Sequence, residues 1–369
     1  MTGDSNRLPL PDALRALALV AVLVVNTVGY AIAPVGPHLG LRLPADSAWA
    51  AATQGLVAGL LQGKGYTMLA FVFGMGLWLA ARRRSPSDAV QRGAVRQRRL
   101  LVLGVLHGAF IYLGDILTLY ALVGWQLIGR LRMPWKRMRR HLALALAGAV
   151  FAKLLLAVVI FRMADLPLVV EGASLSSVRG GGQFLWVNGS TYAIQQVSAL
   201  IFSAPVVYFC MLCGVAAARL RLLTHRRWRA ALKRGLTWAG VPVAAASLAY
   251  GWGYATTPAS QVISPWWETL GEMVSMPTAA LYVAALALAS GGGKARWCQW
   301  LGPLGQRTLS LYVGHSLICM ALFSGLGLGW VLTTVQSVVF CLALWLLAWI
   351  MAAVSGRTRW PLEAWMARR

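Results

Sequence analysis

Residues 142–161 read LALALAGAVFAKLLLAVVIF and contain one charged residue, Lys153. About 20 such residues, each rising about 1.5 Å in a helix, cross the hydrocarbon core of a bilayer. Basic residues flank the stretch on both sides, in WKRMRRH (135–141) and at Arg162. The segment therefore predicts a membrane-spanning helix.

The rest of the chain has the same character. Its 369 residues are 59% hydrophobic and 12% charged, with a mean hydropathy of +0.65. A soluble domain carries about 25% charged residues, and a disordered chain has too little apolar surface to bury. This composition excludes both classes. It predicts an all-α polytopic membrane protein that forms a single integral membrane domain over residues 1–369.

The hydropathy pattern predicts about ten membrane-spanning helices. Their approximate limits are 13–33, 62–81, 100–113, 115–130, 142–161, 195–218, 236–255, 272–290, 308–325 and 330–354. The stretch 47–61 predicts an additional helix at the membrane interface. The outer loops are predicted at 34–61, 162–194 and 256–271.

The net charge of +24 comes from basic residues that gather in alternate loops. Arginine is dense in 82–99, 130–140 and 219–234, and it is also present in 294–307. The loops and termini on one side of the predicted membrane hold 28 of the 34 Lys and Arg residues. Cytoplasmic loops of membrane proteins show this excess. The pattern predicts an even number of spans, both termini in the cytoplasm and a bacterial inner-membrane location, with the lipid bilayer rather than nucleic acid as partner.

Polar side chains inside apolar helices are the first candidates for a functional site, because ionisable groups at bilayer depth are costly. Asp12, Arg15 and Asn26 fall on nearly the same face of the first helix. Alternatively, they form an interfacial ion pair and a helix–helix hydrogen bond.

His107 and Asp115 form a second polar group in the next pair of short spans, followed by Tyr120. Eight residues separate the histidine from the aspartate, about 12 Å along a helix. Two structural alternatives remain open: Asp115 as a helix N-cap and His107 as a hydrogen-bonded packing residue. His38 and His315 are competing candidates for a catalytic base.

Three charged residues stand apart from these groups. Lys153 has no partner close in sequence, and Glu268 and Glu272 lie one turn apart at the start of a span. No His, Cys, Asp or Glu cluster has the spacing of metal ligands. We therefore expect no metal and no tightly bound cofactor.

Several motifs occur in order along the chain. They are DALR (12–15), GKGYTM (63–68), FVFGMG (71–76), HG (107–108), GDILTLYAL (114–122), GPLGQRTLSLY (302–312) and WPLE (360–363). From about residue 8 to residue 366, the chain resembles the YeiB-like bacterial family, also called domain of unknown function 418.

That family resembles the transmembrane acyltransferases, which include bacterial O-acyltransferases and the lysosomal heparan glucosaminide N-acetyltransferase. These enzymes move an acyl group from a cytoplasmic CoA thioester to an acceptor across the bilayer. The O-acyltransferases have an Arg, ten residues and a His in the first helix. Arg15 matches that Arg, and Asn26 stands where the His would be.

The resemblance implies an acyl-CoA-dependent acyltransferase with acyl-CoA as co-substrate. Its acceptor would be a hydroxyl or amine of a small molecule, glycan or lipid. In this hypothesis His107 is the base, Asp115 orients it, and Asn26 or Tyr120 donates to the oxyanion.

Three basic residues, Arg15, Arg98 and Arg99, are the candidates for holding the CoA phosphates. The alternative hypothesis is a transporter or an envelope-assembly protein, in which Asp115 and His107 relay protons. No feature of the sequence predicts an oligomeric state.

Overall fold

The computed structural model describes residues 9–30, 47–164, 175–257, 263–356 and 358–367, and these residues form helices and connecting turns without strands. The long helices are α1 (Pro9–Gly29), α2 (Ala48–Leu60), α3 (Lys64–Ala81), α4 (Pro86–Phe110), α5 (Leu117–Ile128), α6 (Trp135–Ala164), α7 (Gly181–Ser198), α8 (Ala204–Leu220), α9 (Arg229–Thr256), α10 (Pro265–Ala289), α11 (Arg296–Gly305), α12 (Thr308–Phe323) and α13 (Thr334–Val354). A π-helix, η1 (Ala199–Ser203), joins α7 to α8; a 3₁₀ turn, η2 (Arg226–Trp228), precedes α9; and α14 (Pro361–Ala367) ends the described chain.

Six stretches within the described residues are long and apolar enough to cross a membrane. They are Pro9–Gly29, Ala48–Ala81, Trp135–Met163, Gly181–Leu220, Pro265–Ala289 and Thr334–Val354. The helices α5 and α12 are apolar but shorter. These findings confirm the all-α class and the membrane character predicted from hydropathy.

The predicted loop 82–99 is wrong over most of its length, because α4 begins at Pro86. Pro86 is the first helical residue, and the Ser85 side chain caps the helix by accepting from the Asp88 amide. Asp88 then pairs with arginines one turn to each side, at 3.5 Å and 2.6 Å. Arginine is a good helix former, so a stretch that hydropathy marks as a loop still forms a helix.

The predicted outer loops also contain helix that hydropathy missed. Within 162–194, α7 begins at Gly181, directly after Gly180, whose φ of +89° suits only glycine well. Within 256–271, α10 begins at Pro265. The predicted inner loop 294–307 contains α11. Each of these helices carries polar or small residues, which lower the hydropathy of the segment without preventing a helix.

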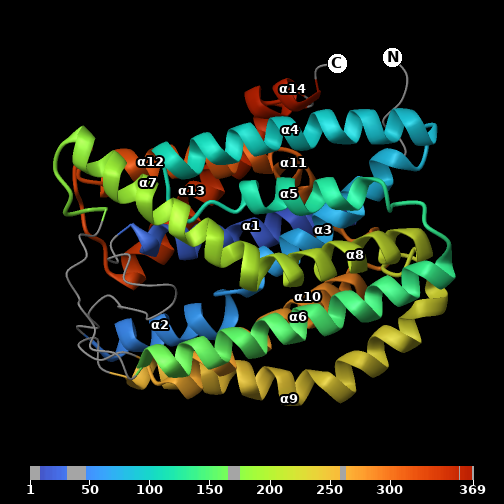
Figure 1. Cartoon of the computed structure of the whole chain (residues 1–369), viewed down its shortest axis with the longest axis horizontal. Coiled ribbons are helices and arrows are strands. Elements are labelled where there is room, and N and C mark those ends of the chain that lie inside the picture. Colours follow the sequence, from blue (N-terminus) through green and yellow to red (C-terminus); the bar gives the residue numbers. More distant parts are fainter. Residues whose placement is uncertain (1–8, 31–46, 165–174, 258–262, 357, 368–369) are drawn as a thin grey trace.

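The centre of the bundle is formed by α1 and α3, with α5 and α8 packed beside them (Figure 1). The contact between α3 and α8 depends on two glycines. A Cβ atom on Gly74 would lie 1.9 Å from the Met211 carbonyl oxygen, and one on Gly214 would lie 1.9 Å from that of Phe71. Small residues let membrane helices approach this closely.

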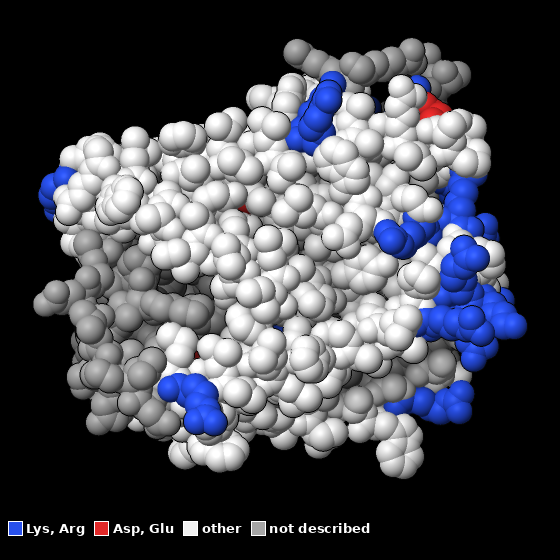
Figure 2. Space-filling model, viewed as in Figure 1, with Lys and Arg blue, Asp and Glu red and all other residues white. Residues whose placement is uncertain are grey.

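Basic residues gather at one end of the bundle. The arginine-rich ends of α4, α6, α8 and α9 all lie at the right of Figure 1, and Figure 2 shows Lys and Arg side chains concentrated on that edge. The basic segments, which alternate with less charged loops along the sequence, therefore lie together at one end of the folded protein.

Candidate functional site

His107 and Asp115 are in direct contact. His107 Nδ1 lies 3.0 Å from Asp115 Oδ1, and both side chains are fully buried. The second carboxylate oxygen, Oδ2, accepts from the Thr118 backbone N–H at 2.8 Å. Asp115 therefore acts as a cap for α5 and as the partner of His107 at once.

A break in the helices brings the two side chains together. Residues 111–116 are not helical, and α5 starts only at Leu117. With 12 residues, α5 is about 18 Å long, and the bilayer core is about 30 Å thick. The bend lies inside the bundle, where Tyr112, Leu113 and Asp115 are buried. Irregular backbone at this depth is tolerated when protein surrounds it.

Side chains of the segment α7–η1 satisfy the backbone around this break. The Asn188 amide donates to the carbonyl oxygens of Gly108 and Ala109, both at 2.8 Å, at the end of α4. The Gln196 amide donates to the Asp115 carbonyl at 3.2 Å. These bonds hold His107 and Asp115 in a fixed geometry.

The hydrogen bonds indicate which nitrogen of His107 carries a proton. A carboxylate only accepts, so Nδ1 is the nitrogen that donates to Asp115. Nε2 is buried and has no hydrogen-bond partner among the described residues. In the neutral imidazole the lone pair is then on Nε2, and this is the arrangement that a general base requires.

Tyr312 and Asn26 complete the surroundings of His107. The Tyr312 ring on α12 packs against the imidazole with its centroid 4.9 Å away. The Tyr312 hydroxyl lies near the Asp115 carboxylate, the Asn26 side-chain amide and the Ile116 backbone. Asn26 Nδ2 and this hydroxyl are both buried. Two polar side chains from distant helices thus lie beside His107.

His315, the competing histidine, has a different environment. Its Nε2 lies 3.1 Å from Thr27 Oγ1, and that hydroxyl donates its single hydrogen to the Leu23 carbonyl at 2.8 Å. The Cys319 sulfur lies 3.7 Å from Nδ1 and 3.6 Å from Nε2 of His315. Both nitrogens are occupied, so His315 fits the role of base less well than His107. The third candidate, His38, lies outside the described residues.

Tyr120 and Arg15 lie apart from His107. The Tyr120 hydroxyl donates to the Tyr66 backbone carbonyl. Arg15 pairs with Asp12 at 3.0 Å, as the spacing predicted, and its guanidinium is near Arg96 of α4. The polar face of α1 therefore connects Arg15 near the basic end of the bundle with Asn26 near His107.

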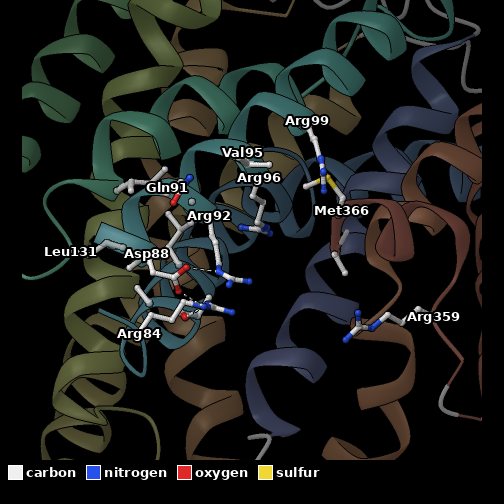
Figure 3. A pocket seen from close by; sticks show the side chains of 17 residues that line it. Arg84, Asp88, Gln91, Arg92, Val95, Arg96, Arg99, Leu131, Arg359 and Met366 are labelled. Carbon is white, nitrogen blue, oxygen red and sulfur yellow. Dashed lines mark hydrogen bonds and ion pairs between the residues drawn. The ribbon is translucent and has the colours of Figure 1, made fainter. Parts of the chain in front are cut away.

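A cavity of about 490 Å³ lies between the N-terminal half of α4, the ends of α3 and α5, and α14. Figure 3 shows the arginine side chains that line it. We call it the arginine pocket, and its charged residues are Arg84, Asp88, Arg92, Arg96, Arg99 and Arg359. Of the residues predicted to hold phosphates, Arg99 lines this pocket, whereas Arg98 is exposed and does not.

The helix α14 forms one wall of the arginine pocket and connects two helices of the site. Arg99 of α4 donates to the Trp365 carbonyl at 3.0 Å. The Glu363 carboxylate accepts from the Leu309 and Ser310 amides, at 2.9 and 3.0 Å, at the start of α12. Helix α4 carries His107 and α12 carries Tyr312, so the C-terminal segment links the two.

Lys153 has a partner that sequence reasoning missed. Its ammonium group on α6 forms an ion pair with Glu272 on α10. Lys153 is 5% exposed and also interacts with Tyr66 of α3. The pair is separated by 119 positions, so no local pattern could reveal it. The available signal was that a lysine in the middle of a span needs a carboxylate.

A bundle of apolar helices with buried ionisable side chains defines a polytopic membrane protein with an internal polar site. The family described as "Protein of unknown function (DUF418)" matches residues 217–362. Over this C-terminal region the chain is similar to the family, in agreement with the resemblance predicted from the motifs. No curated protein matches the chain. The matched region contains Tyr312 and the start of α14 but not His107 or Asp115.

Proposed function

We propose that the protein is a membrane acyltransferase, which moves an acyl group from cytoplasmic acyl-CoA to an acceptor hydroxyl or amine at or beyond the membrane. The observation that carries this proposal is the buried His107, with Nδ1 held by Asp115 and Nε2 unpartnered. A buried base oriented by a carboxylate is the arrangement that activates hydroxyl nucleophiles.

The proposed reaction has two steps. His107 Nε2 takes the proton of the acceptor O–H or N–H while the acceptor oxygen or nitrogen attacks the thioester carbonyl carbon. Asn26 and the Tyr312 hydroxyl donate to the resulting oxyanion. The tetrahedral intermediate then collapses, the C–S bond breaks, and the imidazolium returns its proton to the CoA thiolate. Asp115 stabilises the imidazolium between the two steps.

The test of this function uses acetyl-CoA as donor and an extract of bacterial membranes as the source of acceptors. We expect full-length protein in nanodiscs to release free thiol from acetyl-CoA and to transfer labelled acetyl to a component of the extract. Thiol release and acetyl transfer no faster than with empty nanodiscs would contradict the proposal. Empty nanodiscs with the same extract are the control.

We propose further that ten helical segments cross the bacterial inner membrane, with both termini in the cytoplasm. The clustering of basic helix ends supports this orientation (Figure 2). The crossing segments are α1, α3, α4, α5 together with the non-helical residues 111–116 before it, α6, α7–η1–α8, α9, α10, α12 and α13, and α2 lies toward the outer interface.

This topology predicts the labelling of two exposed positions, Arg226 and Gln183. In intact spheroplasts, an impermeant maleimide should modify Gln183→Cys, whereas Arg226→Cys should react only after permeabilisation. Four of the five native cysteines are buried and the fifth is half-buried, so background labelling is low. The reverse pattern would contradict the proposed orientation.

A second candidate function is transport or envelope assembly. The observation that favours it is the ion pair between the buried Lys153 and the half-buried Glu272, because ionisable pairs inside membranes also mark ion and proton pathways. The acetyl-CoA experiment separates the two functions, since a transporter leaves the thioester intact.

A further inference from the structure

The arginine pocket holds more positive charge than its own carboxylate neutralises. Arg84 and Arg92 share the single Asp88. Arg96 and Arg359 also line the pocket, and no hydrogen bond or ion pair involves either of them within the described chain. In Figure 3, these two side chains extend from opposite walls, Arg96 from α4 and Arg359 from the segment before α14.

The surroundings of Arg96 favour an anion. Its guanidinium stacks over the Phe73 ring, 4.9 Å from the centroid. The Arg96 side chain is partly buried, and the Arg15 guanidinium lies nearby. A bound phosphate would offset both the burial of this charge and its repulsion by Arg15. A pocket of about 490 Å³ is within the size range of small-molecule sites.

Gln97, the residue after Arg96, gives a second and independent indication of a ligand. It is fully buried, and neither Oε1 nor Nε2 has a hydrogen-bond partner among the residues described. Leaving a buried amide unpaired is unfavourable. Gln97 belongs to the same buried face of α4 as His107, about 15 Å away along the helix. It is therefore flanked along α4 by the pocket residues Arg96 and Arg99, on the face of the helix that leads to His107.

We propose that the arginine pocket and Gln97 are the donor site, in which the pocket binds the diphosphate end of the donor and Gln97 pairs with an amide group of its arm. The thioester end then reaches His107. This inference rests on the proposed function and goes beyond it by assigning Arg96, Arg359 and Gln97 as binding residues. Recognition of phosphate by several guanidinium groups is a general mode.

The test measures binding rather than turnover. Full-length protein in phosphatidylcholine nanodiscs is titrated with unacylated CoA and, separately, with ADP. Arg96→Ala and Arg359→Ala should each weaken both ligands roughly tenfold or more, since each removes a charge-assisted hydrogen bond. Gln97→Leu should weaken CoA roughly fivefold and leave ADP unchanged. Arg139→Ala, an exposed arginine at the same end of the bundle, is the matched control and should change neither.

Several results would overturn this assignment. If Arg359→Ala binds both ligands as Arg139→Ala does, the pocket is not the phosphate site; Arg359 is exposed, so folding does not confuse this comparison. If Gln97→Leu loses neither ligand, or both equally, the amide does not contact the arm. Adding phosphatidylglycerol to the nanodiscs tests the other source of phosphate: displacement of CoA from the pocket would identify a lipid headgroup as the ligand.

The binding test and the acyl-transfer test can fail separately. CoA binding with the expected pattern but no acyl transfer would contradict the proposed function alone. Acyl transfer that is insensitive to Arg96, Arg359 and Gln97 would contradict the donor site alone.

Discussion

Replacing His107 by alanine should lower acyl transfer by roughly 10²–10⁴-fold, the usual contribution of a general base. The reason is that, among the described histidines, only His107 has one ring nitrogen bound to a carboxylate and a buried second nitrogen without a partner. The measurement is thiol release from acetyl-CoA by protein in nanodiscs, together with the thermal unfolding midpoint of each variant.

The His107→Ala variant also leaves Asp115 buried without its partner, so loss of activity has to be separated from loss of structure. His107→Gln keeps a donor toward Asp115 and should be equally inactive while unfolding close to the wild-type midpoint. His315→Ala is the matched control, because it removes a buried histidine of a neighbouring helix whose two nitrogens are already occupied. If His315→Ala abolished acyl transfer and His107→Ala did not, His315 would be the base and the assignment of His107 would be wrong.

Removing one partner of the Lys153–Glu272 pair should destabilise the protein by about 3–5 kcal/mol. Lys153→Met takes from the Glu272 carboxylate its ion-pair partner and leaves it the Lys64 ammonium. Glu272→Gln takes from Lys153 its ion-pair partner and leaves it Glu268 and Tyr66. Both single variants should unfold at lower denaturant concentration in detergent, whereas an exposed control, Lys136→Met, should change stability little.

The double variant Lys153→Met/Glu272→Gln decides whether the effect comes from the pair. Removing both charges leaves neither group without its ion-pair partner, so most of the lost stability should return. Additive losses in the double variant would show that the two side chains stabilise the fold independently. The same physics applies during insertion, because α6 enters the membrane long before α10 supplies its carboxylate.

The sequence predicted the class of the fold for a simple physical reason. Stretches such as LALALAGAVFAKLLLAVVIF have only one favourable environment, and the basic ends that flank them gather at one end of the bundle (Figures 1 and 2). Hydropathy did not predict the helices that contain many polar or charged residues, because a helix can form without apolar residues. The arginine-rich start of α4 is helical because of its Ser85 cap and its ion pairs with Asp88.

For the candidate site, the sequence predicted only the grouping of residues that are near one another along the chain. His107 and Asp115 are eight positions apart, and their contact follows from the short spans on either side. Tyr312 comes from a distant helix, and its contact with His107 depends on how α12 packs. Gln97 could not be distinguished from other polar residues of a presumed loop until α4 was seen to extend through it.

Because α4 is continuous, it fixes the distance between Arg96 and His107. The two residues are eleven positions apart on the same helix, which corresponds to about 16 Å. A donor whose phosphates bind at Arg96 would need its thioester carbon about 16 Å away to reach His107. Compounds with a shorter tether would occupy the anchor without reacting, so the spacing along one helix would discriminate among cellular thioesters by length rather than by shape.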